Sequence, residues 1–338
     1  MNKKIITFSI AITFTLSQAL CAANFTWRNT GDLNFNNPSN WGAGVQVPGV
    51  EDIAILKINQ SAVLSDSASI GQLRIGQNAA AGEVTTVELA VGSELKVSSA
   101  HIGYSLGSDN YRGTPSAGVG LLTVNGSLLA GNIFIGNAGQ KTSTNDATGT
   151  IEVNSGGTIT TEQITYIGAK TAGNSAASNG TLIINKGAVY KATGSLIVGH
   201  GSNCSGTLTL NGGSAMLGNG LTLTNKGSAY SGHSATLNLI SGKIVVSGGW
   251  LLFQPKTEKN IMINQGVLIL KGDRKGNLKK LFQDSGTKLS LTGGMSLEQE
   301  AVNSEGYRGI LEITQGDYTL KYGYNPKSDM TALWTVQN

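Results

Sequence analysis

Apolar and polar residues alternate, with a period of two, in short segments that recur along most of the chain. The four clearest segments read GLLTVN, GTIEVN, GTLIIN and GTLTLN, and they begin at Gly120, Gly149, Gly180 and Gly206. A period of two is typical of a β-strand with one buried face. The pattern therefore predicts an inward-facing row made of these apolar residues: Leu122, Val124, Ile151, Val153, Leu182, Ile184, Leu208 and Leu210.

Each segment belongs to a longer unit that contains three short apolar runs. The last run of the unit ends in Ile-Gly or Val-Gly, as at Gly103, Gly136 and Gly168. With the fainter copies, nine units between residues 90 and 314 recur about every 28 residues. Glycine interrupts nearly every stretch long enough for a helix, and propeller blades need about 40 residues. Because parallel crossovers are right-handed, we predict an all-β fold: a right-handed parallel β-helix, or β-solenoid, of about nine coils with three short strands each.

Glycine and asparagine mark the corners between the predicted strands. Glycine adopts the positive φ angles that tight corners need, and asparagine tolerates the left-handed region. Asn125, Asn154, Asn185 and Asn211 follow the four clearest segments at one equivalent position. We expect these asparagines to stack as a structural ladder. A polar binding strip is the alternative.

The start of the chain reads as an export signal. Residues 1–23 place Lys3 and Lys4 before an apolar run of about twelve residues and a small-residue cleavage site, which predicts a signal peptide. We therefore expect a protein that is extracellular, on the cell surface or in the periplasm. In the mature chain no apolar run reaches the length of about 18 residues that a membrane-spanning helix requires.

The two ends of the mature chain depart from the repeat. Residues 24–60 are expected to form an N-terminal cap, in which Trp27 and Trp41 plug the core. Stacking of these two rings on sugars is the alternative. The repeats are expected over residues 61–315, and the aromatic-rich residues 316–338 are expected to close the C-terminal end.

Composition and charge exclude several classes of protein. The 338 residues include 47 glycines, only 13% of them are charged, and the formal net charge is +4. So weak a charge gives no general case for nucleic-acid binding, and a hydrophobic share of 39% is enough for a core. Removal of the signal would leave Cys204 as the one cysteine, so no internal disulfide is expected.

Two surface segments are weak candidates for binding. Inserts of different length lie between the Ile-Gly corners and the next unit, and the first of them carries the candidate anchors Tyr104, Tyr111 and Arg112. Inserts on one face of a solenoid are often its binding face, although drift in loop length is the alternative. The basic run 271–280 also fits an anionic polysaccharide or a lipid headgroup, or else a solvated loop. The candidate residues of this run are Arg274 and Lys275. Trp250, which precedes the run, is a further candidate.

No constellation of residues points to catalysis. Some β-helices act on acidic polysaccharides with clustered carboxylates or a calcium site, but here the acids are scattered along the chain. The spacing of His and Cys fits no metal site, and no Gly-rich loop precedes a helix. We expect no catalytic residue, no metal and no cofactor.

The repeat phrase Gly-Thr-Leu-Thr-Leu-Asn-Gly-Gly, with its Ile-Gly corner, resembles the β-solenoid repeats of autotransporter passengers and of PEP-CTERM-type bacterial surface proteins. The pattern of Trp27, Trp41, Pro48-Gly49 and Asp52 is similar to the start of such proteins, and the resemblance covers roughly residues 25–315. It implies an exported surface or extracellular protein. The last residues, Met330–Asn338, lack the family's C-terminal membrane barrel and its Pro-Glu-Pro anchor, so the resemblance leaves the mode of anchoring open.

Two functions remain at this point. The first is a structural or adhesive surface protein without catalytic activity, which contacts surface glycans or matrix or associates with itself through the solenoid ends. The second is a polysaccharide-binding or polysaccharide-degrading β-helix, a lyase or hydrolase, that would use Trp27, Trp41, Trp250 and the basic run 271–280. A lateral groove with two or more carboxylates would favour the degrading enzyme.

Overall fold

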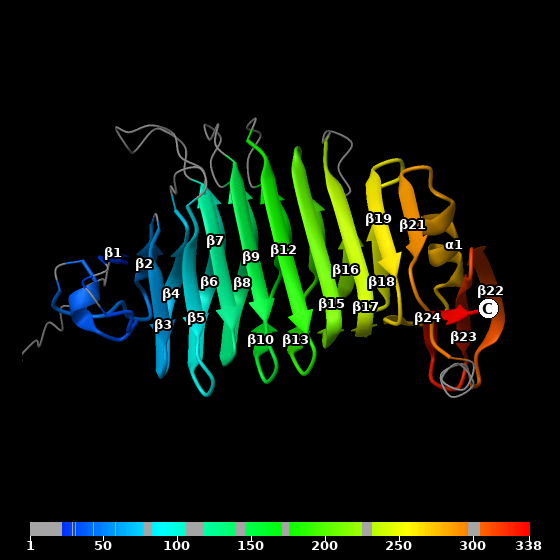
Figure 1. Cartoon of the computed structure of the whole chain (residues 1–338), viewed down its shortest axis with the longest axis horizontal. Helices are drawn as coiled ribbons and strands as arrows, with labels where there is room; N and C mark the ends of the chain where they lie inside the picture. Colours follow the sequence, from blue (N-terminus) through cyan, green and yellow to red (C-terminus); the bar gives the residue numbers. More distant parts are fainter. Residues whose placement is uncertain are drawn as a thin grey trace, which may run out of the picture.

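The computed structural model describes residues 22–338, apart from residues 29, 31, 43 and 58 and the segments 78–82, 106–117, 139–145, 171–175, 225–231 and 297–304. In these residues the chain forms an elongated stack of short strands that advances from the N-terminal to the C-terminal end (Figure 1). The strands of successive coils pair in parallel, so the predicted parallel β-helix is confirmed.

Each coil contributes strands to three parallel ladders, which we call faces A, B and C. Along the chain a coil passes through face B, then face C, then face A. Face B contains β3 (Ser61–Leu64), β5 (Thr85–Leu89), β7 (Gly118–Val124), β9 (Ala147–Val153), β12 (Ser178–Asn185), the first parts of β15 (Cys204–Leu217) and β17 (Ser234–Val246), β19 (Glu258–Ile263) and β21 (Thr287–Leu291).

Faces C and A share three long strands that bend in the middle. Face C contains the first parts of β4 (Ser67–Ile75), β6 (Glu94–Ser105) and β8 (Ser127–Ala138), then β10 (Thr158–Thr161), β13 (Val189–Ala192), the second parts of β15 and β17, and β20 (Val267–Lys271). Face A contains β1 (Asn24–Thr26), β2 (Ile53–Leu56), the second parts of β4, β6 and β8, then β11 (Thr165–Lys170), β14 (Leu196–His200), β16 (Gly220–Leu223) and β18 (Trp250–Phe253).

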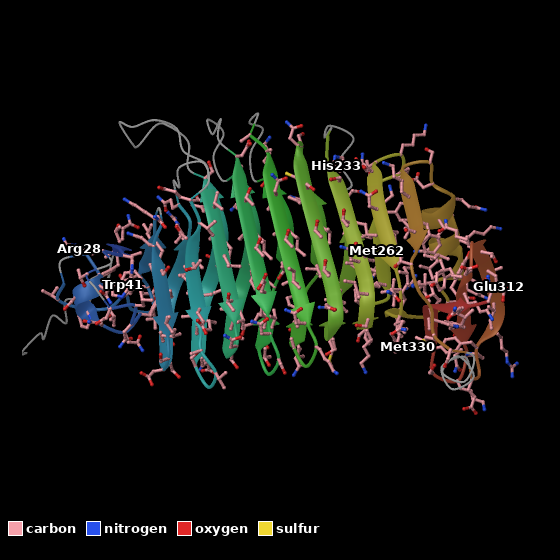
Figure 2. The ribbon with its side chains drawn as sticks, in the orientation of Figure 1. Arg28, Trp41, His233, Met262, Glu312 and Met330 are labelled. Carbon is pink, nitrogen blue, oxygen red and sulfur yellow. The ribbon has the colours of Figure 1, made fainter. Side chains whose placement is uncertain are left out.

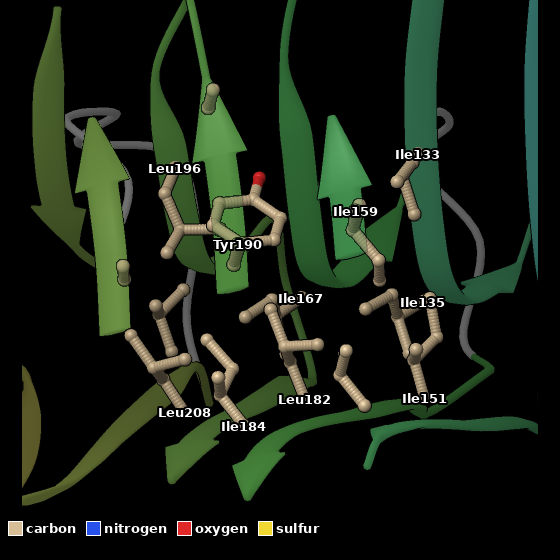
Figure 3. Close-up of a cluster of buried hydrophobic side chains, with 14 of the residues drawn as sticks. Ile133, Ile135, Ile151, Ile159, Ile167, Leu182, Ile184, Tyr190, Leu196 and Leu208 are labelled. Atoms are coloured by element: carbon tan, nitrogen blue, oxygen red, sulfur yellow. The ribbon is translucent and has the colours of Figure 1, made fainter. Parts of the chain in front are cut away.

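The inward row read from the sequence lies in the core. Leu182 pairs in register with Ile151 on one side and with Leu208 on the other. All eight residues of the predicted row are fully buried. Figure 3 shows four of them among the core side chains: Ile151, Leu182, Ile184 and Leu208. Tyr190 of face C also points inward, and its hydroxyl donates to Thr165 Oγ1 over 2.6 Å. Burial raises the pKa of Tyr190 to about 12, so it packs as a neutral core residue.

The corner glycines hold the backbone of neighbouring coils close together. Gly103, Gly136 and Gly168 all have positive φ, at 67°, 65° and 69°. A Cβ atom on Gly136 would lie 2.0 Å from the carbonyl oxygen of Asn179 in β12. Alanine does not fit this corner, because its side chain would overlap a backbone atom that belongs to a parallel ladder.

The asparagine corner is a hydrogen-bonded ladder, as expected. Asn154 Nδ2 donates to Asn125 Oδ1 over 3.0 Å, Asn185 Nδ2 to Asn154 Oδ1 over 3.0 Å, and Asn211 Nδ2 to Asn185 Oδ1 over 3.3 Å. Each amide is thus occupied by its neighbour along the axis, which supports a structural role for this row.

The C-terminal end differs from the expected repeat. The stack has about eight turns rather than nine. The phrase 311–316 lies in β22 (Arg308–Gln315), which pairs antiparallel with β23 (Tyr318–Asn325). β23 pairs antiparallel with β24 (Met330–Gln337), which closes onto β20. The parallel coils therefore end at β21 and not at residue 315, because the chain turns back on itself and covers the end of the core together with helix α1 (Lys275–Gln283).

The N-terminal end is filled by aromatic rings. Trp27, Phe35 and Trp41 are buried, and the ring of Trp41 lies 4.9 Å from each of the other two rings, centroid to centroid. The short 3-10 helix Pro38–Asn40 precedes Trp41, whose indole Nε1 donates to the carbonyl oxygen of Phe35 over 2.7 Å. Figure 2 shows Trp41 at this end of the stack and Glu312 at the opposite end.

Candidate functional site: a lateral groove between two faces

A groove of about 400 Å³ runs along the bend between faces C and A. It crosses the successive coils of β4, β6 and β8 and reaches the turn between β10 and β11. Its lining includes these side chains: Ser69, Lys96, Ser98, Leu129, Glu162 and Gln163. Gly131 lies at this bend, and a Cβ atom there would lie 2.5 Å from the carbonyl oxygen of Ser98, so the backbones of two coils approach closely at the groove.

The polar groups of the groove are held in place by the coils. Asn132 Nδ2 donates to Gln163 Oε1 over 2.8 Å, and Asn132 Oδ1 accepts from the backbone N–H of Ile164 over 3.3 Å. Lys96 Nζ lies 2.9 Å from Glu94 Oε1, and both side chains are about half exposed. The groove lining thus offers the amide of Gln163, the cation of Lys96 and the carboxylate of Glu162.

A row of aromatic rings lies on the outward side of face A. It is two residues further along the strands than the row that contains Asn132. His101, Phe134 and Tyr166 occupy paired positions in β6, β8 and β11. The ring centroids of His101 and Phe134 are 4.7 Å apart, and those of Phe134 and Tyr166 are 5.2 Å apart, with interplanar angles of 9° and 11°. Because the ring faces cover one another, they present edges to the solvent and are poorly suited to stack on a sugar.

His101 is neutral in this environment. Burial and the neighbouring Arg74 guanidinium lower its pKa to about 3. Its Nε2 lies 3.1 Å from Gln72 Nε2, and its Nδ1 lies 3.0 Å from Asn137 Nδ2. A histidine held neutral across the physiological range, with a side-chain amide beside each ring nitrogen, does not carry protons near pH 7.

The inserts leave the solenoid at one edge, as the sequence predicts. Ser105 at the end of β6 pairs with Ala138 of β8, which pairs with Lys170 of β11. The strands that follow also begin at paired residues, Gly118 and Ala147. This edge lies between faces A and B, so the strand ends that flank the inserts and the groove border face A on opposite sides.

The three candidate anchors of the first insert do not form one site in the described residues. Tyr104 is only 9% exposed, and its ring lies 5.0 Å from the guanidinium carbon of Arg74. Tyr111 and Arg112 lie outside the described residues. Arg74, which sequence reasoning missed, has no carboxylate within ion-pair distance among the residues that the structure describes.

The tryptophan candidates fall into two groups. Trp27 and Trp41 are 1% and 0% exposed, so neither presents a ring to a ligand. Trp250 is 54% exposed, and the guanidinium carbon of Arg274 lies 5.9 Å from its ring centroid. Lys275 begins α1, and its Nζ lies 3.8 Å from Asp273 Oδ2.

Cys204 and His233 are buried, and His200 is partly buried. Burial raises the pKa of the Cys204 thiol to about 12, which removes its nucleophilic form near pH 7. Burial also lowers the pKa of His200 and of His233. In the ranges that the structure covers, no group of three or more His, Cys, Asp and Glu side chains is arranged to hold a metal ion. No helix in those ranges is long and apolar enough to cross a membrane.

The groove and the ring row were not identified from the sequence. The sequence does contain a signal for the ring row, because its members stand directly before an Ile-Gly or Val-Gly corner. The residues at this position are Arg74, His101, Phe134, Tyr166 and Ile197. The groove has no such signal, since it depends on the angle between two sheets.

Comparison with known proteins finds no match: no family model, no curated protein and no solved structure is similar to this chain.

Proposed function

We propose that this protein is an exported, non-catalytic β-solenoid that adheres to polysaccharide of a surface or matrix through the lateral groove. The groove at the bend between faces C and A carries the proposal. A linear polymer fits a groove that follows the axis, because the coils repeat the same backbone about every 4.8 Å. Side chains on paired strands are also pre-organised, which reduces the entropy lost on binding.

The lining of the groove favours binding over turnover. Glycoside hydrolysis uses two carboxyl groups about 5–9.5 Å apart, one as acid and one as nucleophile or base. Glu162 is the one carboxylate that lines the groove. Glu94 is not part of the lining and is paired with Lys96. The amide of Gln163, which Asn132 holds in place, suits hydrogen bonds to sugar hydroxyl groups.

The chain 24–338 is expected to bind polysaccharides on a glycan array without releasing reducing ends from them. The double variant Lys96→Ala/Gln163→Ala should weaken binding by about tenfold or more, since it removes two hydrogen-bonding groups, one of them charged. Lys191→Ala is the matched control, because Lys191 continues the same outward row of face C beyond the groove lining. Affinity for the best array ligand, measured by calorimetry, decides the comparison.

Two results would contradict the proposal. Equal losses of affinity in the groove variant and in Lys191→Ala would show that binding is only electrostatic. Release of reducing ends that disappears in Glu162→Gln would instead favour the degrading enzyme.

The common edge of the inserts supports a second contact surface for adhesion. Deletion of residues 109–115 should leave the solenoid folded, because each coil is stabilised by its neighbours and the register of β6 with β8 and of β7 with β9 lies outside the deletion. Circular dichroism is expected to be unchanged, while attachment to cells or matrix decreases. Loss of the fold would show that the segment belongs to a coil, and unchanged attachment would remove the insert from the contact surface.

A further inference from the structure

The charges of the chain are distributed very unevenly. Residues 243–288 contain nine Lys and Arg against three Asp and Glu. The rest of the chain from residue 24 carries 13 basic and 17 acidic residues. A chain whose overall charge is small therefore has one strongly basic region, at the C-terminal third of the solenoid. Such a region attracts polyanions over a range set by the Debye length.

The acids of this region are already engaged. Asp284 Oδ2 lies 2.9 Å from the buried Nζ of Lys259, and Glu258 Oε1 lies 3.2 Å from Lys288 Nζ. Asp273 is within 4 Å of Lys275. By contrast, these cations lie within ion-pair distance of no carboxylate of the described residues: Lys243, Lys256, Lys271, Arg274, Lys279 and Lys280.

Trp250 provides a flat platform inside the basic region. In face A it pairs with Gly220, and the same outward row leads back through residues 195 and 164 to Asn132 beside the groove. Gly220 has no side chain to cover the indole from the neighbouring coil. Arg274 is the one residue with a ring or cation contact to Trp250 among those the structure describes, which agrees with an exposed fraction of 54%.

The position of Arg274 is fixed by its own contacts. Its Nε donates to the carbonyl oxygen of Lys271 over 3.1 Å, and its backbone N–H donates to Thr331 Oγ1 over 2.8 Å. The loop from Lys271 packs on Gly249, which has φ of 69° and directly precedes Trp250. The guanidinium is thereby held beside the indole. Its remaining N–H groups have no hydrogen-bond partner among the described residues, so they can meet a carboxylate in bidentate fashion.

We propose that Trp250 and Arg274 form a subsite for an acidic polysaccharide, in which a sugar ring lies on the indole and its carboxylate binds the guanidinium. The proposal names the ligand class of the proposed function and rests on it. Exposed lysines of the basic region, Lys271, Lys279 and Lys280, supply a field that draws in the polymer. A uronate polymer accounts for both the flat apolar platform and the cation, whereas a lipid surface would need a larger group of exposed apolar side chains than Trp250 and Leu252.

The test compares two forms of one polymer, polygalacturonate and its fully methyl-esterified derivative, with the chain 24–338. We expect polygalacturonate to bind about tenfold or more tightly than the ester, because a charge-assisted hydrogen bond is lost on esterification. The preference should decrease with added salt. Trp250→Ala and Arg274→Gln should each reduce affinity for polygalacturonate by about tenfold, with an unchanged circular dichroism spectrum.

Control variants separate the subsite from net charge. Lys327→Gln removes one positive charge outside residues 243–288 and should change affinity less than about twofold. Arg274→Lys keeps the charge but loses the planar fork, so it should fall between the wild type and Arg274→Gln. Equal binding of the two polymers, or full affinity in Trp250→Ala, would overturn the proposal.

Other outcomes distinguish this inference from the proposed function. Binding of neutral polysaccharide that depends on Lys96 and Gln163, without preference for the acidic polymer, would reject the subsite and leave the groove. Binding only to vesicles that contain phosphatidylserine would replace the polysaccharide by a lipid surface. Failure to bind any polysaccharide would reject both proposals.

Discussion

Gly136→Ala is expected to abolish the native fold or to lower its free energy of unfolding by more than about 4 kcal/mol. Two effects combine at this corner. A φ of 65° costs an L-residue about 1–2 kcal/mol, and the new Cβ would lie 2.0 Å from the carbonyl oxygen of Asn179. That carbonyl belongs to β12, so relief of the overlap would disturb a ladder in the middle of the solenoid.

Gly156→Ala is the matched control for Gly136→Ala. Gly156 has an equally positive φ, 83°, but a Cβ there would meet no atom within 4 Å. It should cost only about 1–2 kcal/mol. Chemical denaturation of both variants measures the difference, and equal stabilities would show that the close approach at Gly136 relaxes easily.

Asp284→Asn is expected to lower the free energy of unfolding by about 3–5 kcal/mol, since it leaves a buried ammonium without its counter-charge. Lys259 Nζ is fully buried and lies 2.9 Å from Asp284 Oδ2. It also donates to the carbonyl oxygens of Gln254 and Thr257 over 2.9 Å and 2.7 Å. Glu258→Gln removes an exposed ion pair with Lys288 in the same part of the fold, and should cost less than about 1 kcal/mol.

The same pair predicts a dependence of stability on acid. Burial alone would raise the pKa of Asp284, but hydrogen bonds from the Lys256 N–H and from Lys259 outweigh it and hold this pKa below the ordinary value of 3.8. The contribution of Asp284 is therefore complete above about pH 4 and is lost as the pH falls through the lower pKa of the folded state. Thermal unfolding of the wild type and of Asp284→Asn should converge at low pH. A constant difference down to pH 2 would contradict this origin.

The position of Lys259 shows why the repeat changes near the C-terminal end. Its place in the inward row of face B is held by Gly149, Gly180 and Gly206 in earlier coils. Those glycines lie against an Ile-Gly or Val-Gly corner, as Gly180 does against Gly168. The strand Trp250–Phe253 is followed by Gln254 instead of such a glycine. Lys259 donates to the carbonyl oxygens of Gln254 and Thr257 at this corner.

The coil could be predicted from the sequence because its rules are local and repeated. A period of two predicts that Leu182 and Ile151 point into the core. Each Ile-Gly corner repeats the same requirement for a backbone with positive φ. The phrase at residues 311–316 follows the same local pattern, yet β22 is antiparallel. The alternation of apolar and polar residues in this phrase predicts a strand. Which strand it pairs with depends on the residues before and after it.

The candidate site was harder to predict, because it depends on arrangement between sheets. Trp41 and Trp250 are the same residue type, but one fills the end of the core and the other lies outward beside Gly220. The groove at Gly131 depends on the bend of β6 and β8. Trp250 and the basic run 271–280 were both candidates from the sequence, but the contact of Trp250 with Arg274 could not be predicted. More than one strand separates the two residues along the chain.

The two closed ends set a limit on growth. In an open parallel stack, the last strand of each face offers its unpaired N–H and C=O groups to any further strand, as in a fibre. Here the rings around Trp41 occupy one end, and the antiparallel β22–β23–β24 sheet occupies the other. The sheet also contains a bulge next to Gly309, which interrupts the regular edge of β22. We therefore expect the number of encoded coils, and not pairing with further copies of the chain, to set the length of the cylinder.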